Sequence, residues 1–254
     1  MGSRELTPVE KVMALNRHAV LPDGSLKTFS QQYGEYSFAK DSGVKSMWEY
    51  TPFVFSMDSS VFGVPPLSGM PLCMTSASVK HVVSKHRAEI GVLDALATEL
   101  VGNVLAFQDA LDDSAFFFVL DEYSKKGNQY ITLVRANIEL KRVEVNEVRS
   151  VHGVADLDKL IDPALDGGKD FFMSERTGAW LEAQGTRFSM GLPSISEGTR
   201  QRLLSLYYTR FPDQATREDP ARRNARAANV ARTLHAGAET GTRTEAHDTA
   251  RRKK

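Results

Sequence analysis

The sequence contains a single cysteine, Cys73, among its 254 residues. One thiol excludes an intramolecular disulfide and a zinc site built from several cysteines, so we expect Cys73 to be a small buried apolar residue. No run of about 18 apolar residues is present, and such a run is what predicts a transmembrane helix. Residues Met1–Glu5 also lack the apolar stretch of a signal peptide. We therefore expect a cytoplasmic protein that does not bind a membrane.

The short motifs of several enzyme classes are also missing. There is no Walker sequence, no Gly-x-Gly-x-x-Gly, no His-Glu-x-x-His and no Gly-x-Ser-x-Gly, the signatures of nucleotide-binding proteins, zinc proteases and serine hydrolases. The acidic residues Asp109, Asp112, Asp113 and Asp121 lack the spacing of a calcium-binding loop and are interpreted as a solvated loop and strand edge. We therefore expect neither a metal ion nor a cofactor.

The chain as a whole has no net charge, but its basic and acidic residues are unevenly distributed. The formal charge is +0 at pH 7. Residues 217–254 contain ten basic and five acidic residues and no aromatic residue, a composition that predicts a basic, disordered tail. Such a tail can bind nucleic acid by neutralising phosphates. A solvated extension or a linker is the alternative interpretation.

Hydrophobic periodicity and turn residues predict a series of helices and strands. Thr7, Pro8 and Glu10 have the pattern of a capping box at the start of a helix. Strands are expected near Phe53 and at residues 104–107, 115–123, 129–140, 142–151 and 170–173, with a hairpin turn at 125–128 and a change of phase near Val148 that predicts a β-bulge. Further helices are expected at residues 90–101, 156–165, 177–183 and 197–211.

This order of elements predicts an α+β fold. N-terminal helices precede a meander of antiparallel strands, with extra helices after it, which argues against a parallel Rossmann-type sheet. We expect residues 1–66 to be an N-terminal extension that packs on the core, and residues 67–193 to form the central α+β domain. Residues 194–216 are expected to form a C-terminal helix, followed by the basic tail at 217–254.

The stretch Met74–Arg87 gathers two of the six histidines with several cations, behind a Thr/Ser cluster that can cap a helix. At about 100° per residue, Val79 and His86 share the apolar face of this predicted helix, while His81 and Lys85 share the opposite face. His86 is therefore a candidate for acid–base chemistry at the edge of the core. A structural histidine beside a solvated basic face is the alternative interpretation.

A longer succession of motifs extends from Leu67 to Pro193, about half of the chain. It consists of Met-Thr-x-x-x-Val-Lys-His with a following Lys-His, an amphipathic helix, a short strand, two hairpin strands, Glu-Val-Asn-Glu-Val-Arg-Ser-Val-His-Gly and Trp-Leu-Glu-Ala-Gln-Gly. This succession resembles the phage MuF C-terminal domain, a family placed with the phage relatives of the barnase, EndoU, colicin E/D and RelE nucleases. The resemblance implies that residues 67–193 have a barnase/EndoU/colicin/RelE-like α+β fold.

Two patterns of that family have counterparts here. The pattern His-x-x-x-(Lys/Arg)-His of the first helix is matched by His81, Lys85 and His86. The pattern Ser-x-Tyr-Gly at the end of a strand is matched by Ser150, with His152 in the place of the tyrosine. The cation that often follows the glycine is absent, because Val154 occupies that position.

The resemblance implies a metal-independent, toxin-like endoribonuclease of a phage or mobile element. Cleaving RNA by attack of the 2′-hydroxyl needs a base, an acid for the leaving oxygen and a cation for the phosphorane. The implied residues are His86, His152 and His81 for proton transfer, Ser150 as a hydrogen-bond donor, and Lys85, Arg149 and Lys80 as phosphate-binding cations. The implied partners are RNA, with tRNA as a candidate, and a protein that neutralises the toxin. The enzyme would act in the cytoplasm, in association with a phage, or after delivery into a target cell.

Two alternatives from other functional classes stay open. The chain could be a catalytically inactive interaction or packaging protein of a phage or mobile element, which binds nucleic acid or protein through its basic tail. It could also be an enzyme with a different substrate, such as DNA or a modified nucleotide.

Overall fold

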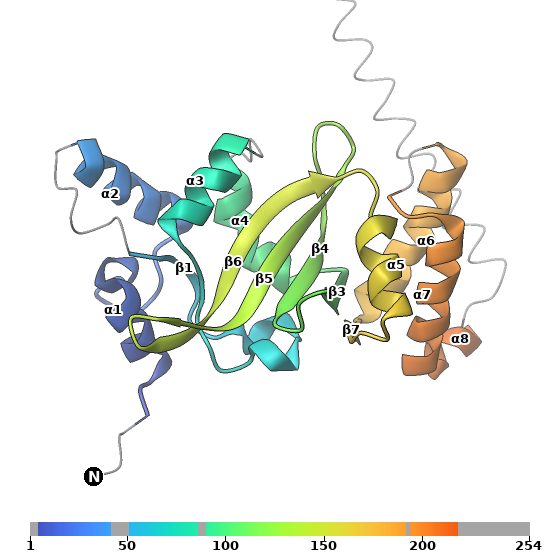
Figure 1. Ribbon diagram of the computed structural model, residues 1–254, viewed down its shortest axis with the longest axis horizontal. Coiled ribbons are helices and arrows are strands. Elements are labelled where there is room, and N and C mark those ends of the chain that lie inside the picture. The colour runs from blue at the N-terminus through green and yellow to red at the C-terminus, as the bar shows by residue number, and fades with distance from the viewer. Residues whose placement is uncertain (1–4, 42–50, 86–89, 192–193, 218–254) are drawn as a thin grey trace, which may run out of the picture. The chain divides into compact units, whose positions relative to one another are not determined.

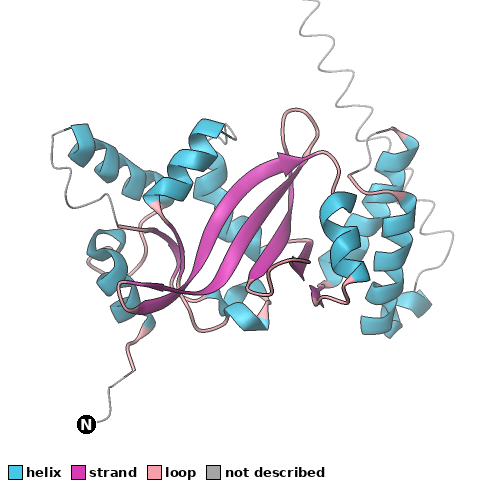
Figure 2. Ribbon diagram, in the orientation of Figure 1, coloured by secondary structure: helices cyan, strands magenta, loops and turns pink. Residues whose placement is uncertain are grey.

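A computed structural model describes residues 5–41, 51–85, 90–191 and 194–217 (Figure 1). The chain forms two compact units, Met1–Arg176 and Thr177–Lys254. The first unit holds a seven-stranded sheet with the strand order β1-β2-β6-β5-β4-β3-β7. The described part of the second unit is helical (Figure 2). The mixed α+β architecture with a mainly antiparallel sheet confirms the predicted α+β class, and the barnase/EndoU/colicin/RelE-like fold stays a prediction.

The strands are β1 (Phe53–Ser56), β2 (Leu72–Met74), β3 (Leu105–Gln108), β4 (Ala115–Tyr123), β5 (Gln129–Leu140), β6 (Val143–Val154) and β7 (Phe171–Phe172). The helices are α1 (Pro8–Asn16), α2 (Phe29–Asp41), α3 (Ser76–Lys85), α4 (Ile90–Val101), α5 (Asp158–Asp166), α6 (Glu175–Ser189), α7 (Glu197–Arg210) and α8 (Pro212–Arg217), with short 3-10 helices at Arg17–Ala19, Ser59–Phe62 and Pro65–Leu67.

The predicted meander is present as β3 to β6, in which neighbouring strands run antiparallel. The turn between β4 and β5 is closed by a hydrogen bond from the Ser124 N–H to the Asn128 carbonyl at 2.8 Å, and Gly127 supplies the positive φ of 77° that the turn requires. The strand β2 was not predicted: it runs parallel to β6, with Leu72 opposite Asn146 and Cys73 opposite Glu147.

One face of the sheet carries the larger hydrophobic core. Val134 of β5 and Val148 and Val151 of β6 belong to a buried cluster that also contains Val79 and Leu96 from the helices α3 and α4. Figure 1 shows α4 passing behind the sheet. Each fully buried aliphatic side chain of this kind contributes about 1.5–3 kcal/mol through removal of apolar surface from water, so this face holds the helices and the sheet together.

The opposite face of the sheet is covered at one end by α1. Val12 and Leu15 of α1 pack in a second cluster with Val54 of β1, Cys73 of β2 and Val145 of β6. Cys73 is buried, as expected. The helix starts with the predicted capping box, in which the Thr7 hydroxyl accepts from the Glu10 N–H at 3.3 Å and the Glu10 carboxylate accepts from the Thr7 N–H at 2.8 Å. Figure 1 shows no helix of the first unit in front of the middle of β5 and β6.

A β-bulge interrupts β6 where the sequence predicted a change of phase. Leu133 pairs with Ser150, but the next residue of β5, Val134, pairs with Val148, so Arg149 is the extra residue. A bulge lets two consecutive side chains leave the strand on the same side. The bulge therefore sets which residues of β6 point away from the larger core.

The helix α2 was not predicted. Only a strand near Phe53 was expected in this part of the chain. Phe29, Tyr33 and Tyr36 lie on one face of α2 and pack against Phe53 of β1, with ring centroids 5.3, 6.2 and 5.6 Å from its ring. Their spacing of four and three residues is the helical signal that identifies this face. Tertiary packing of the aromatic rings stabilises this helix.

In the second unit, α6 and α7 approach each other closely. A Cβ built on Gly178 of α6 would lie 2.7 Å from two atoms of the Tyr207 side chain of α7, and Tyr207 is buried. The predicted helices at 177–183 and 197–211 correspond to α6 and α7. In the described part of the chain, no helix is long and apolar enough to cross a membrane. The predicted tail at 217–254 lies outside the described residues, apart from Arg217.

Candidate functional site

Ser150 and His152 lie side by side on the sheet face that points away from the larger core. Side chains of a strand alternate between its two faces, and Val151 between them is buried among α3 and α4. Ser150 pairs with Leu133 and His152 with Ile131 on β5. Both residues are partly exposed, but Nδ1 of His152 is buried, so a ligand on this face would meet the other atoms of the ring.

Arg149 joins them on the same face because it is the extra residue of the bulge. Its Nη1 donates to Oε2 of Glu147 at 3.0 Å, and its side chain is 50% exposed. Arg149, Ser150 and His152 thus follow one another along β6 as a cation, a hydroxyl and an imidazole. The structure brings together these three of the predicted site residues.

Several of the predicted site residues lie on α3, the helix that was expected to have one apolar face. Val79 and Val82 of α3 are buried in the larger core and Lys80 and His81 are exposed, which confirms the predicted apolar face. The helix packs beside β6. Lys85 is the last residue of α3, but its side chain is not described.

His86 lies outside the described residues. If His86 and His152 act on one nucleotide, we expect their imidazoles to lie within about 12 Å, a span that its phosphate and sugar can bridge by hydrogen bonds.

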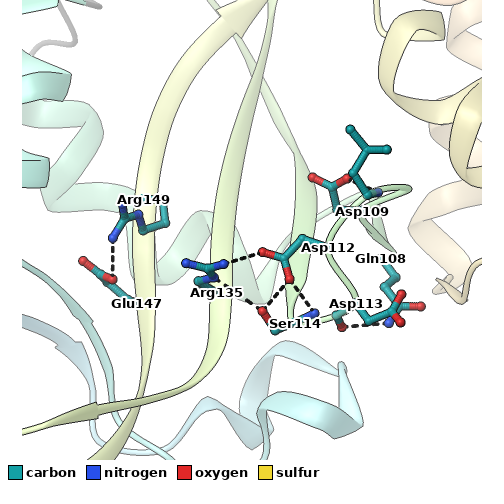
Figure 3. Close-up of polar contacts among 9 residues, drawn as sticks. Gln108, Asp109, Asp112, Asp113, Ser114, Arg135, Glu147 and Arg149 are labelled. Atoms are coloured by element: carbon teal, nitrogen blue, oxygen red, sulfur yellow. Dashed lines mark hydrogen bonds and ion pairs between the residues drawn. The ribbon is translucent and has the colours of Figure 1, made fainter.

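Sequence reasoning missed a set of polar residues beside Arg149 (Figure 3). Arg135 of β5 lies directly opposite Glu147 of β6. Its Nη2 donates to Oδ2 of Asp112 at 2.8 Å and its Nε to the Ser114 hydroxyl at 3.4 Å. The Arg135 side chain is 44% exposed. No short motif marks Arg135, because only the pairing of β5 with β6 places it beside Arg149.

Glu147 is the buried member of this set. Its side chain is 4% exposed, and Oε2 accepts from Arg149, whereas the buried Oε1 has no hydrogen-bond partner among the described residues.

The neighbouring Cys73 is a buried thiol. Burial and, to a lesser extent, the nearby Glu147 carboxylate raise the pKa of the Cys73 thiol well above its ordinary value. Cys73 is therefore a neutral thiol near neutral pH and is not a nucleophile.

The acidic loop at Asp109–Ser114 turns out to hold Arg135 in place. The Ser114 hydroxyl and the Ser114 N–H both donate to Asp112, at 2.6 and 3.0 Å. These two hydrogen bonds and then the bond from Arg135 lower the pKa of Asp112 below its ordinary value of 3.8. The carboxylate is therefore charged at neutral pH and fixes one side of the Arg135 guanidinium.

The structure describes no three His, Cys, Asp or Glu side chains close enough together to hold a metal ion.

The chain was compared with protein-family models, with curated proteins and with solved structures. No family model matches it, no curated protein matches it, and no solved structure matches it.

Proposed function

We propose that this chain is a metal-independent endoribonuclease that cleaves RNA by attack of a 2′-hydroxyl on the adjacent phosphodiester. The observation that carries the proposal is the row of Arg149, Ser150 and His152 on one face of β6. An imidazole and a hydroxyl are suited to proton transfer and hydrogen bonding at the scissile phosphate, and a neighbouring guanidinium is suited to binding RNA phosphate. The sequence resemblance to the phage MuF C-terminal domain supports the same activity.

The chemistry requires two proton transfers. The 2′-oxygen forms a bond to phosphorus as a base removes its proton, and the bond from phosphorus to the 5′-oxygen breaks as an acid protonates that oxygen. The products are a 2′,3′-cyclic phosphate and a free 5′-hydroxyl. Histidine is suited to both steps because its ordinary pKa of about 6.5 allows either protonation state near neutral pH.

His152 is the proposed carrier of one proton, and Ser150 donates a hydrogen bond to a phosphate oxygen. His86 is the proposed second carrier, with His81 of α3 as the alternative. Lys85 and Lys80 would stabilise negative charge on the phosphorane, since they belong to the helix that packs beside β6. Because α3 packs on the larger core and His152 faces away from that core, a substrate would have to reach around β6 to meet His152 and the exposed residues of α3 together.

The test is to incubate the full chain with total RNA and with tRNA, in the presence and absence of EDTA. We expect cleavage that resists EDTA and leaves 2′,3′-cyclic phosphate ends, identified by mass spectrometry. Lys159→Ala serves as a control for loss of a cation, because Lys159 is an exposed residue of α5 whose side chain is 79% exposed. It should cleave like the wild type.

Three results would count against the proposal. Cleavage that EDTA abolishes would show that the reaction needs a metal ion. Intact RNA together with retained RNA or protein binding would favour the inactive interaction protein, and cleavage of DNA in place of RNA would favour the third interpretation.

A further inference from the structure

Two arginines from different strands lie on the face of the sheet that points away from the larger core, which we call the open face. Arg135 and Arg149 lie on β5 and β6, and Glu147, the direct partner of Arg135, is bonded to Arg149. Neighbouring strands lie about 4.8 Å apart and Arg149 lies two residues beyond Glu147, so the two Cα atoms are about 8 Å apart, a span that two long arginine side chains can bridge to one ligand. Figure 3 shows both guanidiniums on the near face of the sheet.

Each guanidinium is held by a carboxylate and still has hydrogen-bonding capacity. A guanidinium has five N–H donors. Among the described residues, Arg149 uses Nη1 toward Glu147, and Arg135 uses Nη2 and Nε toward Asp112 and Ser114. The remaining donors belong to side chains that are 50% and 44% exposed. Two oriented cations with spare donors are suited to an anion that accepts several hydrogen bonds, such as a phosphodiester.

The position of this pair relative to His152 decides which phosphate it meets. Arg149 precedes His152 by three residues on β6, with Ser150 between them, which corresponds to about 10 Å at about 3.3 Å per residue. His152 must contact the ribose or the leaving oxygen at the scissile phosphate. A phosphate bound between Arg135 and Arg149 is therefore a different one, farther along the same RNA strand.

We infer that Arg135 and Arg149 form a subsite for the phosphate that flanks the scissile one in single-stranded RNA. The inference rests on the proposed nuclease function for the assignment of the scissile position, but the binding site itself does not depend on cleavage. Glu147 and Asp112 are positioning residues, because each holds one guanidinium in the orientation that meets the phosphate.

The inference predicts that Arg135 matters only for substrates that have a flanking phosphate. Arg135→Ala should lower kcat/KM for an RNA hexanucleotide about tenfold or more, the usual effect of losing a hydrogen-bonded charge. The loss should appear mainly in KM, since a flanking contact stabilises the bound substrate and the transition state equally. For a dinucleoside monophosphate, which has only the scissile phosphate, the same variant should match the wild type.

Binding provides a second readout that does not require cleavage. A fluorescently labelled RNA hexanucleotide with 2′-O-methyl groups cannot undergo 2′-hydroxyl attack, and its affinity is measured by fluorescence anisotropy at several salt concentrations. Arg135→Ala should weaken binding and reduce the slope of log K against log salt by about 0.7, the value for one phosphate contact on a single strand. Arg135→Lys should retain the slope but recover only part of the affinity, because lysine cannot form the two-pronged contact. Lys159→Ala should change neither.

The outcomes separate the inference from the proposed function. An equal loss of kcat/KM on the hexanucleotide and on the dinucleoside monophosphate would show that Arg135 contacts the scissile phosphate, and the assignment to a flanking phosphate would be wrong. Wild-type affinity and cleavage in Arg135→Ala would remove the subsite altogether. If the wild-type chain leaves all RNA intact while Arg135→Ala still weakens binding, the phosphate subsite stands and the nuclease function falls.

Discussion

At the scale of single residues, His152 is the side chain that the proposed reaction depends on most. His152→Ala should reduce RNA cleavage by about 10²–10⁴-fold, the typical contribution of a general acid or base. Folding should be retained, since His152 lies half-buried on the open face and outside the larger core. Cleavage rate and the urea unfolding midpoint, measured on the same preparation, check both statements.

His152→Tyr is a sharper version of this experiment because it introduces the residue that the resembled family has at this position. Full activity of the tyrosine variant would show that His152 is no obligatory proton carrier and would direct the search to His81. His86→Ala is expected to abolish cleavage as well, a prediction made from the sequence. If His86→Ala and His152→Ala both keep full activity, the mechanism proposed here is wrong.

Asp58 offers a prediction about stability and pH. Its Oδ1 accepts from the Ser60 hydroxyl, the Ser60 N–H and the Gly69 N–H, at 2.6, 2.8 and 3.0 Å, and the Ser60 bonds are the main cause of a pKa below the ordinary 3.8. A lowered pKa in the folded state stabilises the fold above the unfolded-state pKa, and this stabilisation is lost as pH falls through the folded-state value. Asp58→Asn should therefore cost about 1–2 kcal/mol at pH 7.

The measurement is urea unfolding of wild type and Asp58→Asn at pH 7 and at pH values below 3.8. The difference between the two proteins should shrink in acid. Glu5→Gln, which removes an exposed carboxylate, controls for the loss of charge and should show no such convergence. A difference that stays constant with pH would mean that Asp58 is not held as a carboxylate by these hydrogen bonds.

At the scale of elements, two helical glycines give a matched pair of predictions. Gly91 of α4 is exposed, and a Cβ there would meet nothing within 4 Å, whereas at Gly178 of α6 it would lie 2.7 Å from Tyr207. Gly91→Ala should stabilise by about 0.5–1 kcal/mol through helix propensity. Gly178→Ala should destabilise by about 1–3 kcal/mol because the buried ring must move. Thermal unfolding of the two variants shows whether each substitution stabilises or destabilises the protein. Stabilisation by both substitutions would show that α6 and α7 separate easily.

The elements that the sequence predicted well are those stabilised by local signals. The range of β4 was predicted from a nearly continuous apolar run, and β5 follows it across the turn around Gly127. The helix α4 was predicted because its apolar stripe repeats at the helical period. In contrast, β2 is short and pairs in parallel with a strand much later in the chain. Such a pairing has no local signature, so it was missed.

The same distinction applies to the candidate site. Ser150, His152 and Arg149 were predicted because they are neighbours in sequence and have a motif-like spacing. Arg135 and Glu147 were missed because an exposed arginine and a glutamate in amphipathic strands look like solvent-facing residues. Only the register between β5 and β6, which includes the bulge, places both beside Arg149.

At the scale of the whole molecule, removal of the tail is a direct test of the sequence-based division of the chain. Deleting residues 217–254 should leave the thermal unfolding midpoint almost unchanged, because this segment contains no aromatic residue and little apolar surface to bury. RNA affinity should fall at low salt, since ten basic residues are removed. A midpoint lowered by several degrees would show that the tail packs on the rest of the protein.

The predicted domain limits can be compared with the sheet and with the two compact units. Residues predicted as an N-terminal extension supply β1, which forms one edge of the sheet beside β2. The boundary between the two compact units falls between Arg176 and Thr177, near the start of α6. The predicted limits at residues 66, 193 and 216 stay predictions. Sequence patterns locate elements better than they locate the boundaries between them, because boundaries depend on long-range packing.

The parallel joint between β2 and β6 has a consequence for the order of folding. Pairs between distant segments form late, because closing a long loop costs entropy before any contact compensates it. The strands β3 to β6 are neighbours in both sequence and space, so we expect them to associate first and to present the edge on which β2 docks, followed by α3. Arg135 on β5 and Arg149, Ser150 and His152 on β6 belong to the strands that associate first, whereas Lys80 and His81 take their places later, when α3 packs. During refolding, affinity for RNA should therefore return before the ability to cleave it.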